Sequence, residues 1–167
     1  MALTAHMDVD ALVFTGSGAT GRRLLEASAG SNLKCAHLEL GGKSANLVFA
    51  GAPDLKTAAK VSEQGIFRNP GQVFVAGSRL LVQRSIYEDF VSEVTGFAAS
   101  LRVGDPLRLD SDIGGVASED QLRRNLGFVA GAESEGARHL CGGEQILAET
   151  GETYMTPTVF ADGAAVS

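Results

Sequence analysis

VFTGSGATG at residues 13–21, LELGGKS at residues 38–44 and GQVFVAGSR at residues 71–79 are the segments that decide the fold. An apolar run leads into the first glycine-rich turn and an amphipathic run follows it, which predicts a strand, a turn and a helix. The second segment ends another apolar run at a pair of glycines. The region from Val13 to Ser78 therefore predicts an α/β fold with a mainly parallel sheet flanked by helices.

The same alternation continues along the chain. Strands are expected at residues 11–14, 35–40, 46–49, 80–82, 139–141 and 158–160. Helices are expected through residues 22–27, from Asp54 toward Asn69, from Ser85 to Leu101 and from Ser118 toward Gly136. The last two helices begin at Ser-x-x-Glu and Ser-x-x-Gln sequences, which are capping boxes. The continuous apolar run at residues 46–49 is typical of a parallel sheet that is covered on both faces.

Composition indicates a soluble globular protein. The chain has 167 residues, of which 44% are hydrophobic and 20% are charged. A domain of that size buries about 70% of the surface that its unfolded chain exposes. No apolar run reaches the roughly 20 residues of a membrane span, and no signal peptide is evident, so we expect no membrane partner and a cytoplasmic location. The net charge of −6 argues against nucleic acid as a partner.

Cysteine and histidine spacing predicts no metal site. The two cysteines, Cys35 and Cys141, lie 106 residues apart, which fits neither a disulfide framework nor a zinc motif. Both fall in apolar runs, so we expect them to be small buried hydrophobic residues. The three histidines, His6, His37 and His139, are too scattered to suggest metal ligands.

The first glycine turn matches a phosphate-binding pattern. Gly16, Gly18 and Gly21 form G-x-G-x-x-G between a predicted strand and a predicted helix, and Glu39 follows 18 residues after Gly21. The N–H groups and the dipole at the start of the helix would favour a pyrophosphate, and Ser17 would add a hydroxyl donor. The alternative interpretation is a plain turn that opens a helix.

All three segments resemble the central third of NAD(P)-dependent aldehyde dehydrogenases. That family reads Phe-Thr-Gly-Ser-x-x-x-Gly, Glu-Leu-Gly-Gly-Lys and Gly-Gln-x-Cys-x-Ala-Gly-Ser-Arg at these places. Gly18 is the dispensable glycine of the first pattern. Further matches extend the resemblance from about His6 to Phe160, nearly the whole chain. The resemblance implies that residues 1–40 are a remnant of the coenzyme-binding domain and that residues 41–167 are a partial catalytic domain.

The resemblance also implies site residues. Glu39 takes the position of the general base that activates the deacylating water, and Gly16, Ser17 and Gly21 take cofactor-binding positions for NAD or NADP. Phe74 stands where the family has its nucleophilic cysteine, so this nucleophile position is vacated. A phenyl ring can form neither a hemithioacetal nor a thioester. We expect residues 73–75 to be well-packed apolar chain.

The inherited reaction implied by the resemblance is NAD(P)-dependent oxidation of an aldehyde to a carboxylic acid. Because the nucleophile is replaced and family members are much longer, we expect a truncated protein with no turnover of its own. Its uncovered sheet edges and apolar faces would favour self-association or docking to another chain. Alternative functions are a non-catalytic interaction module and a minimal nucleotide-binding protein. A third alternative is an ordinary enzyme gene that has a broken reading frame or an altered residue 74.

Overall fold

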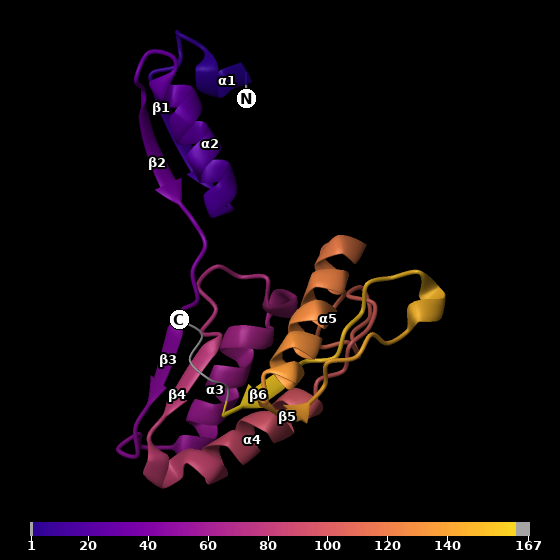
Figure 1. Ribbon diagram of the computed structural model, residues 1–167. Coiled ribbons are helices and arrows are strands. Elements are labelled where there is room, and N and C mark those ends of the chain that lie inside the picture. Colours follow the sequence, from indigo (N-terminus) through magenta and orange to yellow (C-terminus); the bar gives the residue numbers. More distant parts are fainter. Residues whose placement is uncertain (1, 163–167) are drawn as a thin grey trace. The chain divides into compact units, whose positions relative to one another are not determined.

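The computed structural model describes residues 2–162, which form two compact units (Figure 1). The first unit ends at Lys43 and the second begins at Ser44. Residues 41–44, between the last strand of one unit and the first strand of the other, have no regular secondary structure. The division falls three residues beyond the boundary expected from the sequence at residues 40 and 41.

The first unit is one strand, helix and strand preceded by a short helix. Its elements are α1 (Ala2–Ala5), β1 (Ala11–Thr15), α2 (Gly18–Ala29) and β2 (Cys35–Glu39). β1 and β2 pair in parallel, from Ala11 opposite Cys35 to Thr15 opposite Glu39. The sequence had indicated only a polar lead-in where α1 lies. The strand, glycine turn and helix are present as predicted.

Buried polar contacts join the lead-in to the rest of the first unit. The Lys34 ammonium group, which is buried, donates hydrogen bonds to the Thr4 carbonyl oxygen at 2.7 Å and to Ser31 Oγ at 2.9 Å. Asn32 Nδ2 donates to the Val9 carbonyl oxygen at 3.0 Å. A buried ammonium group needs such acceptors, because an unpaired charge would be costly to desolvate.

The second unit contains two strand pairs and three helices among its described residues. Its elements are β3 (Ala45–Val48), α3 (Leu55–Phe67), β4 (Arg79–Val82), α4 (Tyr87–Ala99), α5 (Glu119–Ser134), β5 (Arg138–Cys141) and β6 (Val159–Ala161), with 3-10 turns at Asn69–Gly71, Arg84–Ile86 and Ala148–Thr150. β3 and β4 are parallel, whereas β5 and β6 are antiparallel. The α/β class with mainly parallel pairing is confirmed, and the antiparallel pair is the addition.

The core of the second unit lies between the β3–β4 pair and the helices α3 and α4. Its buried centre is formed by Val48, Ala59, Phe90 and Val94, and Phe90 is only 1% exposed. Half-buried apolar side chains surround this centre, among them Leu55, Leu80, Val82, Ile86 and Phe97. Ala59 lies on α3 and Phe90 lies on α4, so both helices contribute to the buried centre.

Side chains cap α3 and α5, whereas the capping box expected for α4 is absent. Asp54 caps α3 by accepting from the N–H groups of Lys56 and Thr57, and Ser118 caps α5 by accepting from the Gln121 N–H. The capping box expected at residues 85–88 is wrong. Ser85 lies inside the 3-10 turn Arg84–Ile86, so α4 begins only at Tyr87 without a side-chain cap.

The expectation that residues 46–49 are covered on both faces is also wrong. The strand runs from Ala45 to Val48, and while Val48 is buried, Leu47 is 62% exposed. Phe49, directly after the strand, is exposed as well. The physical reason is that β3 has one strand partner, β4, and its core-forming helices pack against a single face.

Cys35 contradicts the expectation that both cysteines are buried. It lies on the exposed face of β2, because alternate residues of a strand point to opposite faces and the half-buried face carries Ala36 and Leu38. Cys141 is half-buried, and burial raises the pKa of its thiol.

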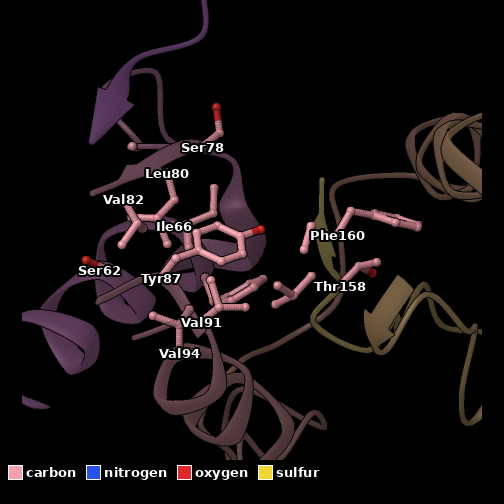
Figure 2. A pocket seen from close by; sticks show the side chains of 14 residues that line it. Ser62, Ile66, Ser78, Leu80, Val82, Tyr87, Val91, Val94, Thr158 and Phe160 are labelled. Carbon is pink, nitrogen blue, oxygen red and sulfur yellow. The ribbon is translucent and has the colours of Figure 1, made fainter. Parts of the chain in front are cut away.

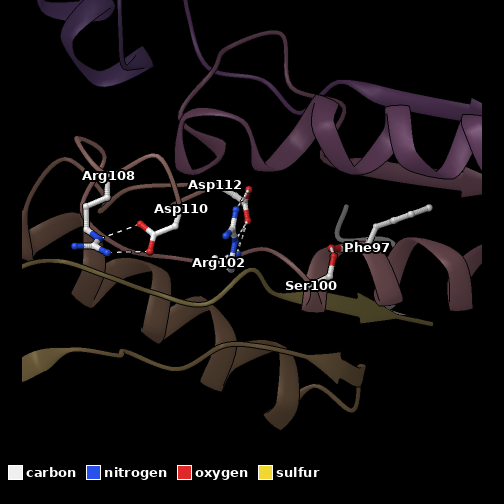
Figure 3. Close-up of polar contacts among 6 residues, drawn as sticks. All are labelled: Phe97, Ser100, Arg102, Arg108, Asp110 and Asp112. Carbon is white, nitrogen blue, oxygen red and sulfur yellow. Dashed lines mark hydrogen bonds and ion pairs between the residues drawn. The ribbon is translucent and has the colours of Figure 1, made fainter.

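Ion pairs between Arg and Asp side chains hold the loop at residues 107–117 (Figure 3). The carboxylate of Asp112 accepts hydrogen bonds from Arg102 Nε at 3.0 Å, Arg102 Nη2 at 3.2 Å and the Arg102 backbone N–H at 2.9 Å. Within the loop, both oxygens of the Asp110 carboxylate pair with the Arg108 guanidinium at 2.9 Å. The hydrogen bonds from Arg102 lower the pKa of Asp112 to about 2.

No helix in the range 2–162 is long and apolar enough to cross a membrane. The same range contains no group of three or more His, Cys, Asp or Glu side chains that could hold a metal ion.

Candidate functional site

The turn after β1 is built around Gly16 and Ser17. Ser17 is the N-cap of α2, and its Oγ accepts a hydrogen bond from the Thr20 N–H at 3.2 Å. The Gly16 N–H donates to the Glu39 carbonyl oxygen at 3.0 Å, which ties the first motif to the second. A Cβ on Gly16 would run into the ring of Phe14. Glycine at position 16 therefore leaves room for the Phe14 ring, and Ser17 satisfies one N–H group at the start of α2.

Gly21 and Gly18 differ in the space around them. Gly21 is buried, and a Cβ there would press on the Leu40 side chain at 2.8 Å. At Gly18 the nearest atom to such a Cβ would be a guanidinium nitrogen of Arg22 at 3.7 Å. Gly18 therefore has room for a side chain, as expected of the dispensable glycine of the motif, whereas Gly21 lies against the Leu40 side chain.

Glu39 is the last residue of β2 and lies opposite Thr15 at the end of β1. Its side chain is exposed and shares a strand face with Cys35 and His37. The first unit therefore places the carboxylate at the carboxyl end of its two-stranded sheet, next to the turn that starts α2. Its role as a general base stays a prediction.

Phe74 lies at the tip of a turn in the second unit. The Ala76 N–H donates to the Val73 carbonyl oxygen at 3.0 Å, which places Phe74 and Val75 at the two central positions of the turn. The Phe74 ring is 85% exposed, and Val75 is exposed too. The expectation that residues 73–75 are well-packed apolar chain is therefore wrong, because the turn projects both side chains away from the core.

The stems of this turn are fixed even though its tip is exposed. Gln72 Oε1 accepts from the Ala117 N–H at 3.1 Å, and Ala76 is buried. A Cβ on Gly77 would come within 3.1 Å of Asn46 Cβ, so the chain passes close to β3 there. A hydrogen bond on one side and close packing on the other therefore hold both ends of the turn that presents Phe74.

The five predicted site residues are divided between the two units. Gly16, Ser17, Gly21 and Glu39 gather around the start of α2 and the end of β2, whereas Phe74 belongs to the second unit. The cofactor-binding role of the three turn residues is not tested by this geometry and stays a prediction.

A cavity of about 170 Å³ lies in the second unit between α3, β4, α4 and the segment that contains β6 (Figure 2). Its wall is largely apolar, with Ile66, Leu80, Val91 and Phe160 among the lining residues. Hydroxyl groups come from Ser62, Ser78, Tyr87 and Thr158. Sequence analysis missed this cavity, because its walls come from elements far apart in the chain.

A polar cluster beside the cavity was also missed. Tyr87 Oη donates to Asp162 Oδ1 at 2.6 Å, and Arg138 Nε donates to Asp162 Oδ2 at 2.8 Å. The Asp162 hydrogen bond raises the pKa of Tyr87, while the bonds from Tyr87 and Arg138 lower the pKa of Asp162. No sequence motif signals these three residues, since they come from α4, β5 and the end of β6.

A sequence model described as the aldehyde dehydrogenase family matches residues 1–166. The chain belongs to the aldehyde dehydrogenase family. It is 42% identical over 161 residues to an aldehyde dehydrogenase of Alternaria alternata, an alignment that covers 96% of this chain and 32% of that protein. It is 41% identical over 161 residues to the mitochondrial aldehyde dehydrogenase of Homo sapiens, with 96% of this chain and 31% of that protein covered.

Solved aldehyde dehydrogenase structures match the fold. The γ-glutamyl-γ-aminobutyraldehyde dehydrogenase of Burkholderia cenocepacia matches with a TM-score of 0.91 and 43% identity over 95% of this chain and 32% of that one. An indole-3-acetaldehyde dehydrogenase complexed with NAD+ matches with a TM-score of 0.92 and 45% identity, again over 95% and 32%. This aldehyde dehydrogenase family chain thus spans about a third of the length of the relatives that it matches.

Proposed function

We propose that this chain is an aldehyde dehydrogenase family segment that keeps parts of the site for NAD(P)-dependent oxidation of an aldehyde to a carboxylic acid but turns over no aldehyde by itself. The observation that carries the proposal is Phe74. It occupies the cysteine position of the family's Gly-Gln-x-Cys motif, at the tip of a turn whose stems are fixed.

The inherited reaction needs a thiolate at that position. The sulfur adds to the aldehyde carbon, and the thioester left after hydride loss is then hydrolysed. A phenyl ring has no lone pair that could form this bond. Cys141 lies on β5 and Cys35 lies on β2, so neither belongs to the turn that carries Phe74. Glu39 retains the carboxylate needed to activate water, but it has no thioester on which to act.

NAD or NADP is the proposed cofactor, and the start of α2 fits a phosphate group. Gly16 and Gly18 present backbone without side chains. Ser17 caps the Thr20 N–H, so the N–H groups of Gly18 and Ala19, at the start of a 12-residue helix, are the ones that could face an anion. Unpaired N–H groups and the helix dipole favour an anion at such a place. The nicotinamide of a bound cofactor would supply the hydride acceptor.

The first experiment is a calorimetric titration of the purified chain with NAD and with NADP, repeated with Phe74→Cys. The same proteins are assayed for aldehyde-dependent formation of NAD(P)H. We expect the native chain to form no NAD(P)H with any aldehyde. If Phe74→Cys forms NAD(P)H from an aldehyde, the absence of a thiol at position 74 is the main reason why the native chain lacks this activity.

The titration also separates the alternative functions. Saturable binding that Ser17→Ala weakens, without turnover in either protein, would favour a minimal nucleotide-binding protein. Absence of binding and of rescue would favour a non-catalytic interaction module. Aldehyde oxidation by the native chain would contradict the proposal outright.

The open face of the β3–β4 pair favours an interaction module as the second candidate. Leu47 and Leu81 are neighbours in the strand register, and they are 62% and 46% exposed. Parallel sheets are usually covered on both faces, so another surface is expected to cover these side chains. A second copy of the chain or another polypeptide of this family could cover the exposed side chains of Leu47 and Leu81.

A cytoplasmic location is likewise proposed from the sequence alone. The matched relatives include a cytosolic aldehyde dehydrogenase of Mus musculus and the mitochondrial aldehyde dehydrogenase of Homo sapiens, so the comparisons do not choose between compartments.

A further inference from the structure

The cavity between α3, β4, α4 and β6 is bounded by parts of the second unit that are themselves packed. Val91 and Val94 of α4 and Ala161 of β6 line it, and all three are buried. Leu80 lines it from β4, on the face of that strand opposite to Leu81. The cavity therefore belongs to the packed interior of the second unit, and not to the exposed face of the β3–β4 pair.

Hydrogen bonds at the edge of the cavity hold its β6 wall in place. Tyr87 lines the cavity from the start of α4, and its hydroxyl group donates to Asp162 Oδ1 at 2.6 Å. Arg138 Nε donates to the other oxygen of the same carboxylate at 2.8 Å. Because Asp162 directly follows β6, these bonds tie the end of that strand to α4 and β5. The cavity is therefore pre-formed, which lowers the free energy cost of binding a ligand in it.

Two further hydroxyl groups that line the cavity are also engaged within the protein. Ser62 Oγ donates to the Ala58 carbonyl oxygen at 2.8 Å and accepts from Asn46 Nδ2 at 2.9 Å. Thr158 Oγ1 donates to the Thr156 carbonyl oxygen at 3.1 Å. An ordered buried water typically has about two to four polar partners. Because these hydroxyl groups are already bonded, the cavity holds water poorly and presents a mainly apolar surface to a molecule that enters it.

We propose that this cavity is a binding site for small, neutral, apolar molecules of the size of one aromatic ring. Its volume is about 170 Å³, and an engineered apolar cavity of about 150 Å³ in another protein binds benzene. Within residues 2–162, every residue that lines the cavity is uncharged. A carboxylate or ammonium group would therefore lose its hydration there without gaining a charged partner. The site favours toluene over benzoate, which has the same ring but a negative charge.

The ring of Tyr87 favours an aromatic molecule within this class. Figure 2 shows this ring among the side chains of Ile66, Leu80 and Val91. Aromatic rings attract one another in edge-to-face and offset-stacked arrangements, and this attraction adds to the effect of the apolar area that they bury. Toluene, which combines one ring with one methyl group, is therefore the probe for this site.

The test is a titration of the isotope-labelled full chain with toluene, followed by NMR of the methyl groups. We expect the methyl signals of Leu80, Val91 and Val94 to shift saturably, with a dissociation constant of about 1 mM or lower. Benzoate at the same concentrations should leave these signals unchanged. Ala161→Leu fills part of the cavity and should weaken toluene binding at least about tenfold. Ala130→Leu is the matched control, because it makes the same change at an exposed position of α5.

Ile66→Phe fills the cavity from α3 and replaces Ala161→Leu if that variant does not fold, which circular dichroism verifies. Undiminished toluene binding in a folded filling variant would overturn the proposal. Shifts that do not saturate, or that are equally large at the exposed Leu47 and Leu107, would do the same.

A second copy of the chain is the rival occupant of the cavity. In that case the methyl signals of Val91 and Val94 would shift with protein concentration in the absence of toluene, and this result would also overturn the proposal. None of these outcomes depends on NAD(P) binding or on aldehyde oxidation.

Discussion

At the scale of single residues, Phe74 matters for the proposed loss of catalysis but contributes little to the packing of the fold. Its ring is almost fully outside the core, so the turn that presents it does not depend on its packing. Substitutions at such exposed positions usually change stability by less than about 0.5 kcal/mol. Phe74→Cys is therefore a clean test of the missing thiol, because the variant should fold as the native chain does.

Gly142, unlike Phe74, is a position where the size of the side chain matters for the fold. It directly follows β5 and lies close to the chain that leads into β6. Its φ is +74°, and a Cβ would overlap the Pro157 carbonyl group on the segment that leads to β6. Gly136 also has a positive φ, +84°, but its Cβ would meet nothing.

We expect Gly136→Ala to lower the free energy of unfolding by about 1 kcal/mol, which is the cost of the left-handed backbone alone. Gly142→Ala should lower it by several kcal/mol, since steric overlap with backbone adds to the same cost. Chemical denaturation of both variants measures the difference. Equal losses would mean that the segment around Pro157 moves aside without cost.

At the scale of elements, side chains fix where helices begin and how long loops close. Asp54 and Ser118 satisfy the first N–H groups of α3 and α5. Asp112 stabilises a loop in a similar way. Its carboxylate accepts hydrogen bonds from the backbone N–H and the guanidinium of Arg102, ten residues earlier.

Asp112 predicts a dependence of stability on pH. Its pKa is about 2 in the folded chain against an ordinary value of 3.8, because Arg102 hydrogen-bonds the charged form. A depressed folded pKa stabilises the fold above the ordinary value, and this contribution disappears as the pH falls through the folded value. We expect Asp112→Asn to lower the melting temperature at pH 6, with the deficit vanishing between about pH 4 and pH 2.

Asp110→Asn is the control for this prediction. Its partner Arg108 is only two residues away, so that ion pair closes no comparable loop. Thermal melts across the pH range should show a smaller deficit for this variant. A deficit in Asp112→Asn that stays constant down to pH 2 would contradict the assignment.

At the scale of the whole molecule, each unit has a two-stranded parallel sheet with an exposed face. In the first unit that face carries Val13, Cys35 and His37. In the second unit it carries Leu47 and Leu81. Two-stranded sheets are marginal without packing on a neighbouring surface. Both faces are therefore places where contact with other polypeptide would add stability.

We expect the chain to self-associate in a concentration-dependent manner through the β3–β4 face. Leu47→Ser should weaken association about tenfold, the equivalent of roughly 1.4 kcal/mol from lost apolar burial. Leu109→Ser is the matched control, because Leu109 is fully exposed in a loop away from this sheet. Sedimentation equilibrium measures both. A monomer at all concentrations, or equal weakening by both substitutions, would contradict the prediction.

The sequence by itself determined the α/β class, the order of the main strands and helices, and the family, because these depend on local periodicity, caps and motif letters. Asp54, Ser118 and the glycines at 16 and 21 are examples whose local signals were sufficient. Only the tertiary structure decided exposure: Leu47, Phe74 and Cys35 lie in apolar runs that predicted burial, yet all three are exposed. Burial depends on which surfaces pack against a residue. That is also why the cavity and the Tyr87–Asp162–Arg138 cluster could be found only in the folded chain.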